Sequence, residues 1–331
     1  MRIVPLLTIL ATVVIAWAAF TVDAAEVSSE PPAFTFVRRP AQLDIKLGSQ
    51  QLATYVFRST RIARPHFTHL RTPSGLQVTR SDPPVEGQDP TDHADMHPGL
   101  WLAFGNLAGL DFWRNKGPCI EQERFVQEPQ TSRNGGSFAV ANRYIVDGRA
   151  LCRETTRYRF LTRPNGWLML WDTTFETTER GVFFGDQEEM GLGIRMASPL
   201  CVKGGQGTIT NSLGGKNEAG TWGRQAAWCD YSGVVGGRRV GVTLMSASAN
   251  DRHPWFHTRD YGLMVANPFG KSANAPERLP LWPDRPLRLC FGVFIHDTPS
   301  GESLNQGAEY EHFDHLVGDK ASGPLTSRQA E

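Results

Sequence analysis

The sequence predicts an all-β protein: a large antiparallel β-sandwich with one C-terminal helix. Apolar and polar residues alternate in many short runs, which is the period of a strand with one buried face. Gly, Pro and Asn bound these runs at hairpin-like spacing, as at 73–75, 146–149, 163–166 and 234–239. Helical periodicity is scarce until near the C-terminus. Short turns between alternating strands favour antiparallel pairing in two packed sheets.

The alternating runs extend from near the N-terminus to the middle of the chain. They are QLDIKLG (42–48), QLATYVF (51–57), SFAVANRYIV (137–146), LCRETTRYRFL (151–161) and WLMLWDTTFE (167–176). In the last run Trp167, Met169 and Trp171 share a nearly all-apolar face. This run therefore predicts a strand with a buried face near the centre of a sheet.

One helix is predicted over 302–316. Its narrow apolar stripe consists of Leu304, Ala308, Phe313 and Leu316. Thr298 and Ser300 are the alternative residues for its start, and Gly318 is the residue for its end. We expect this helix to lie against the sandwich.

The N-terminal segment predicts export. Arg2 precedes an apolar run over 3–22, and Val22 and Ala24 are small residues at a cleavage site, so residues 1–24 are a predicted signal peptide. The alternative is a retained anchor, because the run is almost long enough to span a bilayer. After cleavage we expect a periplasmic or extracellular protein with no membrane partner.

The rest of the chain is predicted to form one domain. Residues 25–33 are a polar lead-in, residues 34–318 a single β-sandwich domain and residues 319–331 a disordered tail. No internal repeat or clear linker divides the chain. The alternative is a boundary in the glycine-rich region 204–220.

Composition and absent motifs exclude several function classes. The 34 Lys and Arg residues balance the 34 Asp and Glu residues, and the basic residues are scattered, so we expect no nucleic-acid partner. No dinucleotide-binding, phosphate-loop, HExxH or EF-hand motif occurs, and the cofactor stays unknown. The 5 cysteines form no CxxC pair, which favours buried thiols or one or two disulfides over a catalytic thiol.

The stretch DHADMHPGLW (92–101) is the first candidate for chemistry. If its backbone were extended, His93, Asp95 and His97 would project to one side. Two imidazoles and a carboxylate there could bind a divalent metal, or provide a base and its orienting partner. The alternative is a hydrogen-bonded turn that precedes a strand, LWLAF.

The second candidate is FFGDQEEMGLGIRMA (183–197). Alternation would place Glu188 and Glu189 on opposite faces, so at most one faces a given pocket. That carboxylate could act as an acid or base beside Arg195, which could hold an anionic or hydroxyl-rich ligand. A solvated acidic loop is the alternative.

The third candidate is NDRHPWFHTRDYG (250–262). Pro254 argues against a regular helix, so His253 and His257 are not a helical metal pair, and the segment is interpreted as a loop that enters a strand. A binding surface and a structural role remain open for it. Tryptophans in turn-like contexts could stack on sugar rings, although core packing explains most aromatic residues; they are Trp101, Trp113, Trp222, Trp228, Trp255 and Trp282.

Four long strings carry a resemblance to a known family. They are RPHFTHLRTPSGLQVTR, DHADMHPGLWLAFGNLAGLDFWRNKG, FGDQEEMGLGIRMA and RHPWFHTRDYGLMVANPFG. The chain from Arg64 to Gly270 closely resembles a bacterial family labelled "methane oxygenase PmoA". The resemblance implies a β-sandwich from bacteria that degrade complex carbohydrate.

We predict an exported protein of the sugar-mutarotase-like sandwich type that acts on a carbohydrate or modified sugar by general acid/base chemistry. His93 or His97, oriented by Asp92 or Asp95, faces a pocket opposite Glu188, Glu189 or His257. The predicted catalytic residues are Asp92, His93, His97, Glu188 and His257. The predicted contacts to a small-molecule or oligosaccharide ligand are Arg64, His66, Trp101, Trp113, Arg195, Trp222, Arg259, Tyr261 and Asn267.

Two alternatives belong to other classes. The first is a non-catalytic carbohydrate-binding protein. The second is a metal-dependent oxidoreductase, as the family label suggests.

Overall fold

A computed structural model describes residues 33–133, 135–250, 253–269 and 278–318. All of them belong to one compact unit, Pro32–Glu331. The predicted signal peptide, the lead-in up to residue 32 and the predicted tail lie outside the described residues. Among the described residues, no helix has the length and apolar character needed to cross a bilayer.

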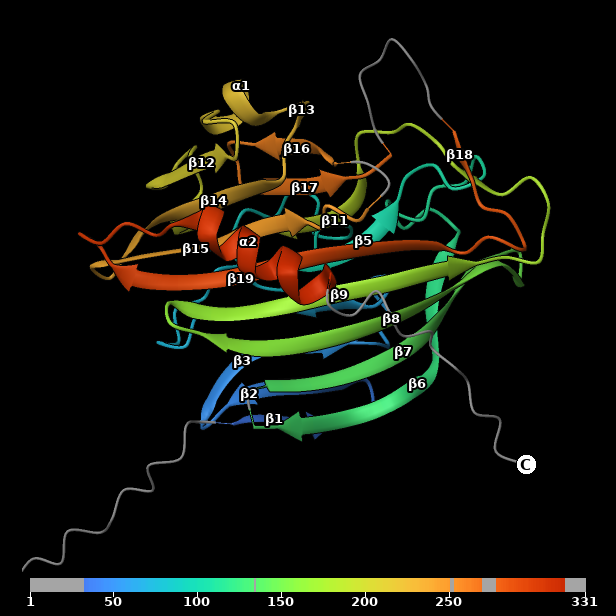
Figure 1. The fold of residues 1–331 in the computed structure, drawn as a ribbon, viewed down its shortest axis with the longest axis horizontal. Coiled ribbons are helices and arrows are strands. Elements are labelled where there is room, and N and C mark those ends of the chain that lie inside the picture. The colour runs from blue at the N-terminus through green and yellow to red at the C-terminus, as the bar shows by residue number, and fades with distance from the viewer. Residues whose placement is uncertain (1–32, 134, 251–252, 270–277, 319–331) are drawn as a thin grey trace, which may run out of the picture. The chain divides into compact units, whose positions relative to one another are not determined.

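Two large antiparallel sheets confirm the predicted fold class (Figure 1). The 9-stranded sheet has the order β1-β2-β3-β4-β5-β11-β17-β16-β13. Its strands are β1 (Phe34–Arg38), β2 (Gln42–Leu47), β3 (Gln50–Val56), β4 (His66–Thr68), β5 (Leu100–Phe104), β11 (Met190–Arg195), β17 (Leu263–Asn267), β16 (Trp255–Arg259) and β13 (Arg224–Gln225).

The 8-stranded sheet has the order β12-β14-β15-β19-β9-β8-β7-β6. Its strands are β12 (Gly207–Asn211), β14 (Trp228–Val235), β15 (Arg238–Ser246), β19 (Leu287–Pro299), β9 (Gly166–Glu176), β8 (Arg149–Arg163), β7 (Gly135–Val146) and β6 (Cys119–Ser132). A small ribbon pairs β10 (Phe183–Phe184) with β18 (Leu279–Pro280), and the short helices are η1 (Ser198–Leu200) and α1 (Asn217–Thr221).

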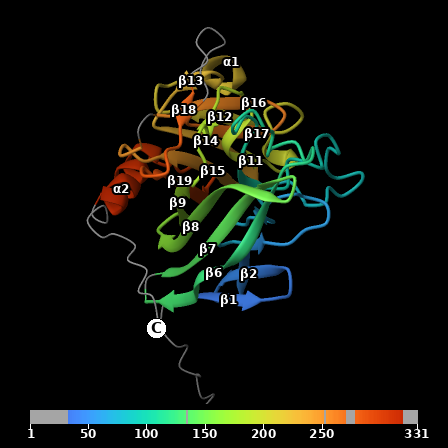
Figure 2. The same cartoon turned by 90° about the vertical axis from the view of Figure 1, so that its right-hand side faces the viewer.

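Aromatic side chains from both sheets fill the space between them. Phe67 on β4 contacts Tyr158 on β8 and Trp171 on β9, with ring centroids 5.0 and 5.6 Å apart. At one edge the sheets meet, where Thr131 of β6 donates a hydrogen bond to the carbonyl of Phe34 in β1 (Figure 2). The alternation in the sequence thus produced two inner faces that share one core.

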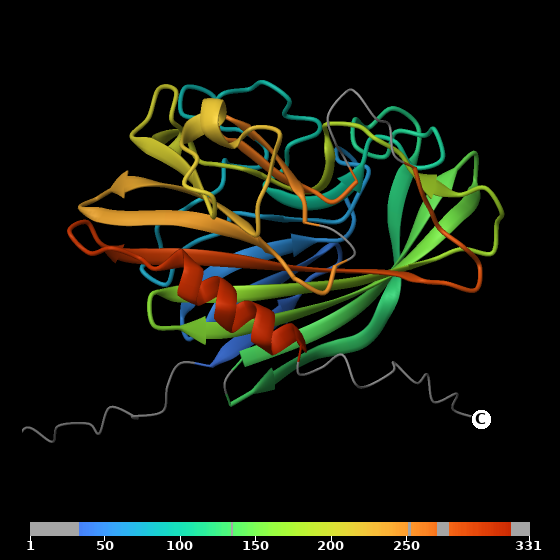
Figure 3. The ribbon, with the colours of Figure 1, turned by 45° about the horizontal axis from the view of Figure 1, so that its top comes forward.

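The predicted central strand and C-terminal helix are both present. β9 lies between β8 and β19, and α2 (Gln306–Gly318) crosses the outside of the 8-stranded sheet (Figure 3). Phe313 of α2 packs on Leu168 and Leu170, so β9 is buried on both faces. The predicted helix start at Thr298 or Ser300 is wrong, because β19 extends to Pro299 and the Asn305 side chain accepts a hydrogen bond from the Ala308 N–H.

The outer face of the 9-stranded sheet, away from the shared core, carries the candidate site. Residues such as Phe67, Ile194 and Met264 point inward, and their strand neighbours point to the other face. There, the rings of Trp101 and Trp113 lie over Gly193, whose missing Cβ would stand 2.9 Å from both rings. A side chain at this position would displace both rings, so the covering requires glycine.

Candidate functional site

The 92–97 segment is a turn, which was the alternative to an extended backbone, so the strand alternation that would have aligned His93, Asp95 and His97 does not occur. Arg80 fixes this turn through backbone carbonyls: Nη1 donates to Asp92 O at 2.7 Å, and Nη2 donates to His97 O at 3.1 Å. The backbone of His93 is left-handed, with φ of 53°. Among the described residues, no cluster of three or more His, Cys, Asp or Glu side chains could hold a metal ion.

Asp92 and His93 form a dyad on this turn. Nδ1 of His93 lies 3.0 Å from Oδ2 of Asp92, and both side chains are about two-fifths exposed, at 41% and 42%. Arg195 donates to the other carboxylate oxygen at 2.9 Å. Burial raises the pKa of Asp92, but Arg195, the bond from His93 and Arg80 together bring it below its usual value. The ionised carboxylate therefore holds the Nδ1 proton, and the other ring nitrogen of His93 can exchange protons with a ligand.

His97 lies beneath the dyad and is 1% exposed. Its ring stacks on Trp101 at 5.2 Å and meets Trp113 edge-on at 6.2 Å. Burial, followed by the charges of nearby cations, lowers the pKa of His97 to about 2. The expectations that His97 faces a pocket and that Trp101 and Trp113 stack on a ligand are wrong, because all three side chains are covered.

Tyr261 lies beside the dyad. The Arg195 guanidinium stands 4.5 Å from the centre of its ring, and the His93 ring is 6.3 Å away in a stacked orientation. Burial raises the pKa of Tyr261, while Arg195 and Arg259 act to lower it. The pKa of Tyr261 therefore depends on charged side chains of both the 92–97 turn and strand β16.

On β16, His257 is held as a neutral imidazole. Trp222 donates its indole N–H to Nδ1 at 3.2 Å, so Nδ1 is unprotonated and Nε2 carries the ring proton. Burial, and then Arg259, lower the pKa of His257 to about 4. Glu188 Oε2 lies 3.5 Å from the same Nδ1, but this contact is not a hydrogen bond because both atoms are acceptors.

Next to His257 a cavity of about 250 Å³ is lined by Glu218, Ala219, Trp222 and Arg259. Trp222 is 42% exposed, and the guanidinium of Arg259 lies 5.6 Å from its ring centre. Arg259 also donates to Glu218 at 2.8 Å and lies 3.5 Å from Glu188. Glu218, on α1, was not predicted from the sequence, since only its position in the folded chain brings it to Arg259.

The two neighbouring glutamates have different partners, but both lie before β11 begins at Met190, so the expected strand alternation does not apply to them. Glu188 approaches Arg259, whereas Glu189 forms an ion pair with Arg114. Asn267 donates to the carbonyl of Gln187 at 2.7 Å and so holds the turn that presents Glu188. The expected ligand contact by Asn267 is therefore replaced by a positioning role.

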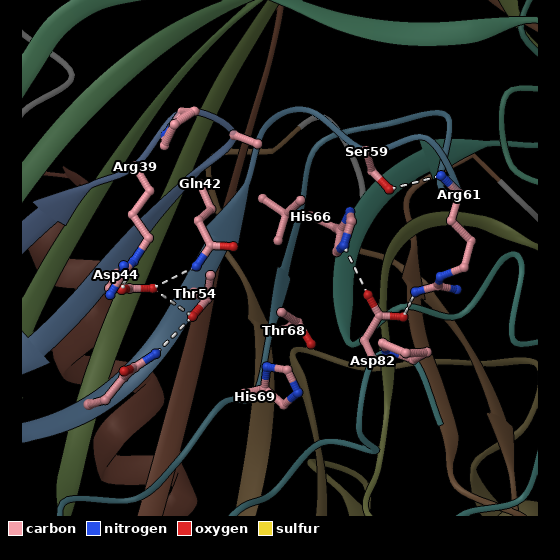
Figure 4. A pocket seen from close by; sticks show the side chains of 15 residues that line it. Arg39, Gln42, Asp44, Thr54, Ser59, Arg61, His66, Thr68, His69 and Asp82 are labelled. Atoms are coloured by element: carbon pink, nitrogen blue, oxygen red, sulfur yellow. Dashed lines mark hydrogen bonds and ion pairs between the residues drawn. The ribbon is translucent and has the colours of Figure 1, made fainter. Parts of the chain in front are cut away.

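Two further predicted residues are not shown to contact the dyad. Arg64 is 3% exposed and donates to the backbone carbonyls of Trp113 and Met96, so it fixes loops rather than a ligand. His66 lines a separate cavity of about 710 Å³ over β2, β3 and β4 (Figure 4). Other side chains of this cavity, which sequence reasoning missed, include Asp44, Thr54, Thr68, His69 and Asp82.

The 5 cysteines are free thiols, and 4 of them are buried.

The fold and the site define an all-β sandwich with a histidine–aspartate dyad on the outer face of one sheet. The chain belongs to a family of unknown function (DUF6807), whose model matches residues 42–309. The predicted membership of a methane oxygenase PmoA family is wrong, because no such family is found. The oxidoreductase alternative, which depended on that label, loses its basis.

No curated protein matches the chain. Among solved structures, a putative kojibiose phosphorylase from the human microbiome is 6% identical with a TM-score of 0.37, covering 88% of this chain and 33% of its own. A galactose mutarotase-like protein from Lactobacillus casei is 9% identical with a TM-score of 0.36, and the match covers 80% of this chain and 100% of that protein. A GalM/aldose epimerase homologue from C. elegans is 9% identical with a TM-score of 0.33, covering 81% and 99%. The chain thus spans only 33% of the length of the phosphorylase.

Proposed function

We propose that this protein is exported and acts on a carbohydrate or modified sugar by general acid/base chemistry. The observation that carries the proposal is the Asp92–His93 dyad, which is exposed, whereas His97 beneath it is covered. Arg195 and Arg80 keep Asp92 ionised, and Asp92 fixes the tautomer of His93. A base with one proton held by a carboxylate is ready to remove a proton at its other nitrogen.

The groups around the cavity next to His257 suit a sugar. A pyranose has an apolar C–H face and a rim of hydroxyls, and the exposed ring of Trp222 offers a surface for the first. Arg259, Glu218 and the Nε2–H of His257 offer donors and acceptors for the second. Glu188, which is 55% exposed, is the candidate for the opposing acid.

A screen against sugars and oxidised sugars, followed by NMR of the products, tests the activity. With a substrate in hand, His93→Gln and Asp92→Asn should lower kcat by about 10²–10⁴-fold, the usual contribution of a positioned acid or base. His315→Gln, on α2, is the control and should retain wild-type kcat. A turnover that His93→Gln leaves unchanged would exclude the dyad as the catalytic group.

A second candidate function is non-catalytic sugar binding. Trp222, Arg259 and Glu218 form a lined cavity without the dyad, which favours this alternative. In that case Trp222→Ala should abolish sugar binding, whereas His93→Gln should leave it intact and no product should form.

Export has its own test. Residues 1–24 carry the features of a signal peptide. The N-terminus of the protein recovered from the periplasm or medium should be Ala25. A protein found only in the cytoplasm with its N-terminal segment intact would contradict export.

A further inference from the structure

The cavity over β2, β3 and β4 is a second place where a ligand fits. Its volume of about 710 Å³ falls within the range of about 300–1,000 Å³ that is typical of small-molecule sites. Figure 4 shows Asp44 and Thr54 on one side of the cavity and His66 and Asp82 on the other. Thr68 lies between the two sides. The cavity is thus bordered by polar side chains that converge from three strands and a loop.

Neither carboxylate in this cavity is left without a cation. Asp44 accepts a hydrogen bond from Arg39 at 2.8 Å, and Asp82 forms an ion pair with Arg61. Both arginines are themselves lining residues. Because each negative charge is already matched, the cavity favours a neutral ligand over a cation or an anion.

One wall residue has spare hydrogen-bonding capacity. Thr54 and Thr68 are directly paired across β3 and β4, so both hydroxyls lie on the same face. Thr54 donates to Asp44 at 3.1 Å. The Thr68 hydroxyl, on a residue 3% exposed, has no partner within the described part of the chain. A buried hydroxyl without a partner is unfavourable, and a bound hydroxyl group would satisfy it.

His69, the residue after Thr68, also favours a ligand site in this cavity. His69 lines the cavity and has a left-handed backbone, with φ of 53°. Such a conformation is uncommon for a residue with a side chain and is concentrated at ligand sites. Burial lowers the pKa of His69, so its ring is neutral near pH 7 and offers one donor and one acceptor.

We propose that this cavity binds one neutral, polyhydroxylated ring, a hexopyranose, through Thr68 and His69. A sugar hydroxyl both donates and accepts, which matches a wall of hydroxyl, imidazole and carboxylate groups. The site is separate from the dyad, since none of Asp92, His93 and Trp222 lines it. The inference therefore does not require the proposed activity.

Saturation-transfer NMR with D-glucose, D-galactose and D-mannose tests the site, with D-glucuronate and D-glucosamine as charged counterparts. Thr68→Val should weaken hexose binding by about tenfold, because it removes one ligand hydrogen bond. Thr298→Val is the matched control: Thr298 is buried too, at 1% exposed, and its hydroxyl also lacks a partner in the described residues, but it lies on β19 outside the cavity. Both variants should fold like the wild type, and the control should bind like it.

Trp222→Ala separates this site from the cavity next to His257. Hexose binding that survives Trp222→Ala and is about tenfold weaker in Thr68→Val supports the cavity. Binding that Trp222→Ala removes and Thr68→Val leaves intact overturns the cavity and leaves the proposed function standing. Wild-type protein that binds none of the neutral hexoses, or that prefers D-glucuronate or D-glucosamine to them, also overturns the proposal.

Discussion

Two glutamates in different regions of the sandwich have opposite surroundings. Glu154, on β8, lies between the sheets and is 3% exposed. Its Oε1 accepts hydrogen bonds from Thr156 and Thr173, both at 2.8 Å, and its Oε2 accepts from Asn142 at 3.2 Å and Tyr144 at 3.3 Å. Burial raises the pKa of Glu154, while these bonds act to lower it.

Glu188 lies at the other extreme, on the outer face of the 9-stranded sheet. Its side chain is 55% exposed, and its carboxylate approaches Arg259 only at 3.5 Å. Both carboxylate oxygens of Glu154 accept hydrogen bonds from other side chains of the protein. The carboxylate of Glu188 is instead exposed and can accept hydrogen bonds from a ligand. The difference separates a polar group that stabilises the fold from one that is available to a ligand.

The largest effect on folding is expected from Glu154→Gln. Glutamine replaces one accepting oxygen with a donating NH₂ group, so two buried donors lose their acceptor. Each loss costs about 1–3 kcal/mol, and we expect the free energy of unfolding to fall by about 2–6 kcal/mol in urea titrations. Glu128→Gln, where the side chain is 64% exposed, is the control and should change it by less than about 0.5 kcal/mol. Equal losses of unfolding free energy in Glu154→Gln and Glu128→Gln would show that the buried hydrogen bonds of Glu154 do not stabilise the fold.

His97 tests whether burial on the outer face of the sheet opposes ionisation as strongly as burial between the two sheets. The pKa of His97 is about 2 in the folded protein, against about 6.5 in the unfolded chain, so the unfolded chain binds the extra proton. Its contribution to stability is complete above pH 6.5 and is lost progressively as the pH falls toward 2. Between pH 7 and pH 5 this loss amounts to about 2 kcal/mol.

His97→Phe keeps an aromatic ring against Trp101 and removes the titrating group. Unfolding free energies measured at pH 7 and pH 5 should therefore differ by about 2 kcal/mol less in the variant than in the wild type. At pH 7 the variant should be no less stable, because both ring nitrogens of His97 lack a partner among the described residues. An unchanged pH dependence would mean that His97 accepts a proton in the folded protein.

The local structure of the sheets could be predicted from the sequence, but their assembly could not. Alternation over 167–176 identified β9, because the period of a strand is a local property. The position of β11 between β5 and β17 depends on pairings between residues far apart in the chain, such as Leu192 with Leu102 and Ala266. No local pattern encodes such neighbours.

The site could be predicted only in part, because the sequence shows which residues are neighbours in the chain but not which distant strands lie side by side. Asp92 and His93 are adjacent in the chain, so their pairing could be anticipated, whereas the bond from Arg195 needed β11 to lie beside β5. Trp101 was misjudged because its turn-like context in the sequence does not show that His97 and Trp113 cover its ring in the folded chain. Thr68 was missed because a threonine in a strand carries no motif.

The smallest effect on folding is expected from Glu188→Gln. The substitution is the same as at Glu154, but the exposed carboxylate has only weak ion pairs to lose, so the free energy of unfolding should change by less than about 0.5 kcal/mol. If Glu188 is the opposing acid, kcat on a substrate from the sugar screen should fall while KM stays nearly constant, because the amide keeps the shape but cannot give up a proton. A stability loss as large as that of Glu154→Gln would assign Glu188 to the fold. Unchanged stability with unchanged kcat would exclude it from proton transfer and leave Tyr261 or His257 as the group to substitute next.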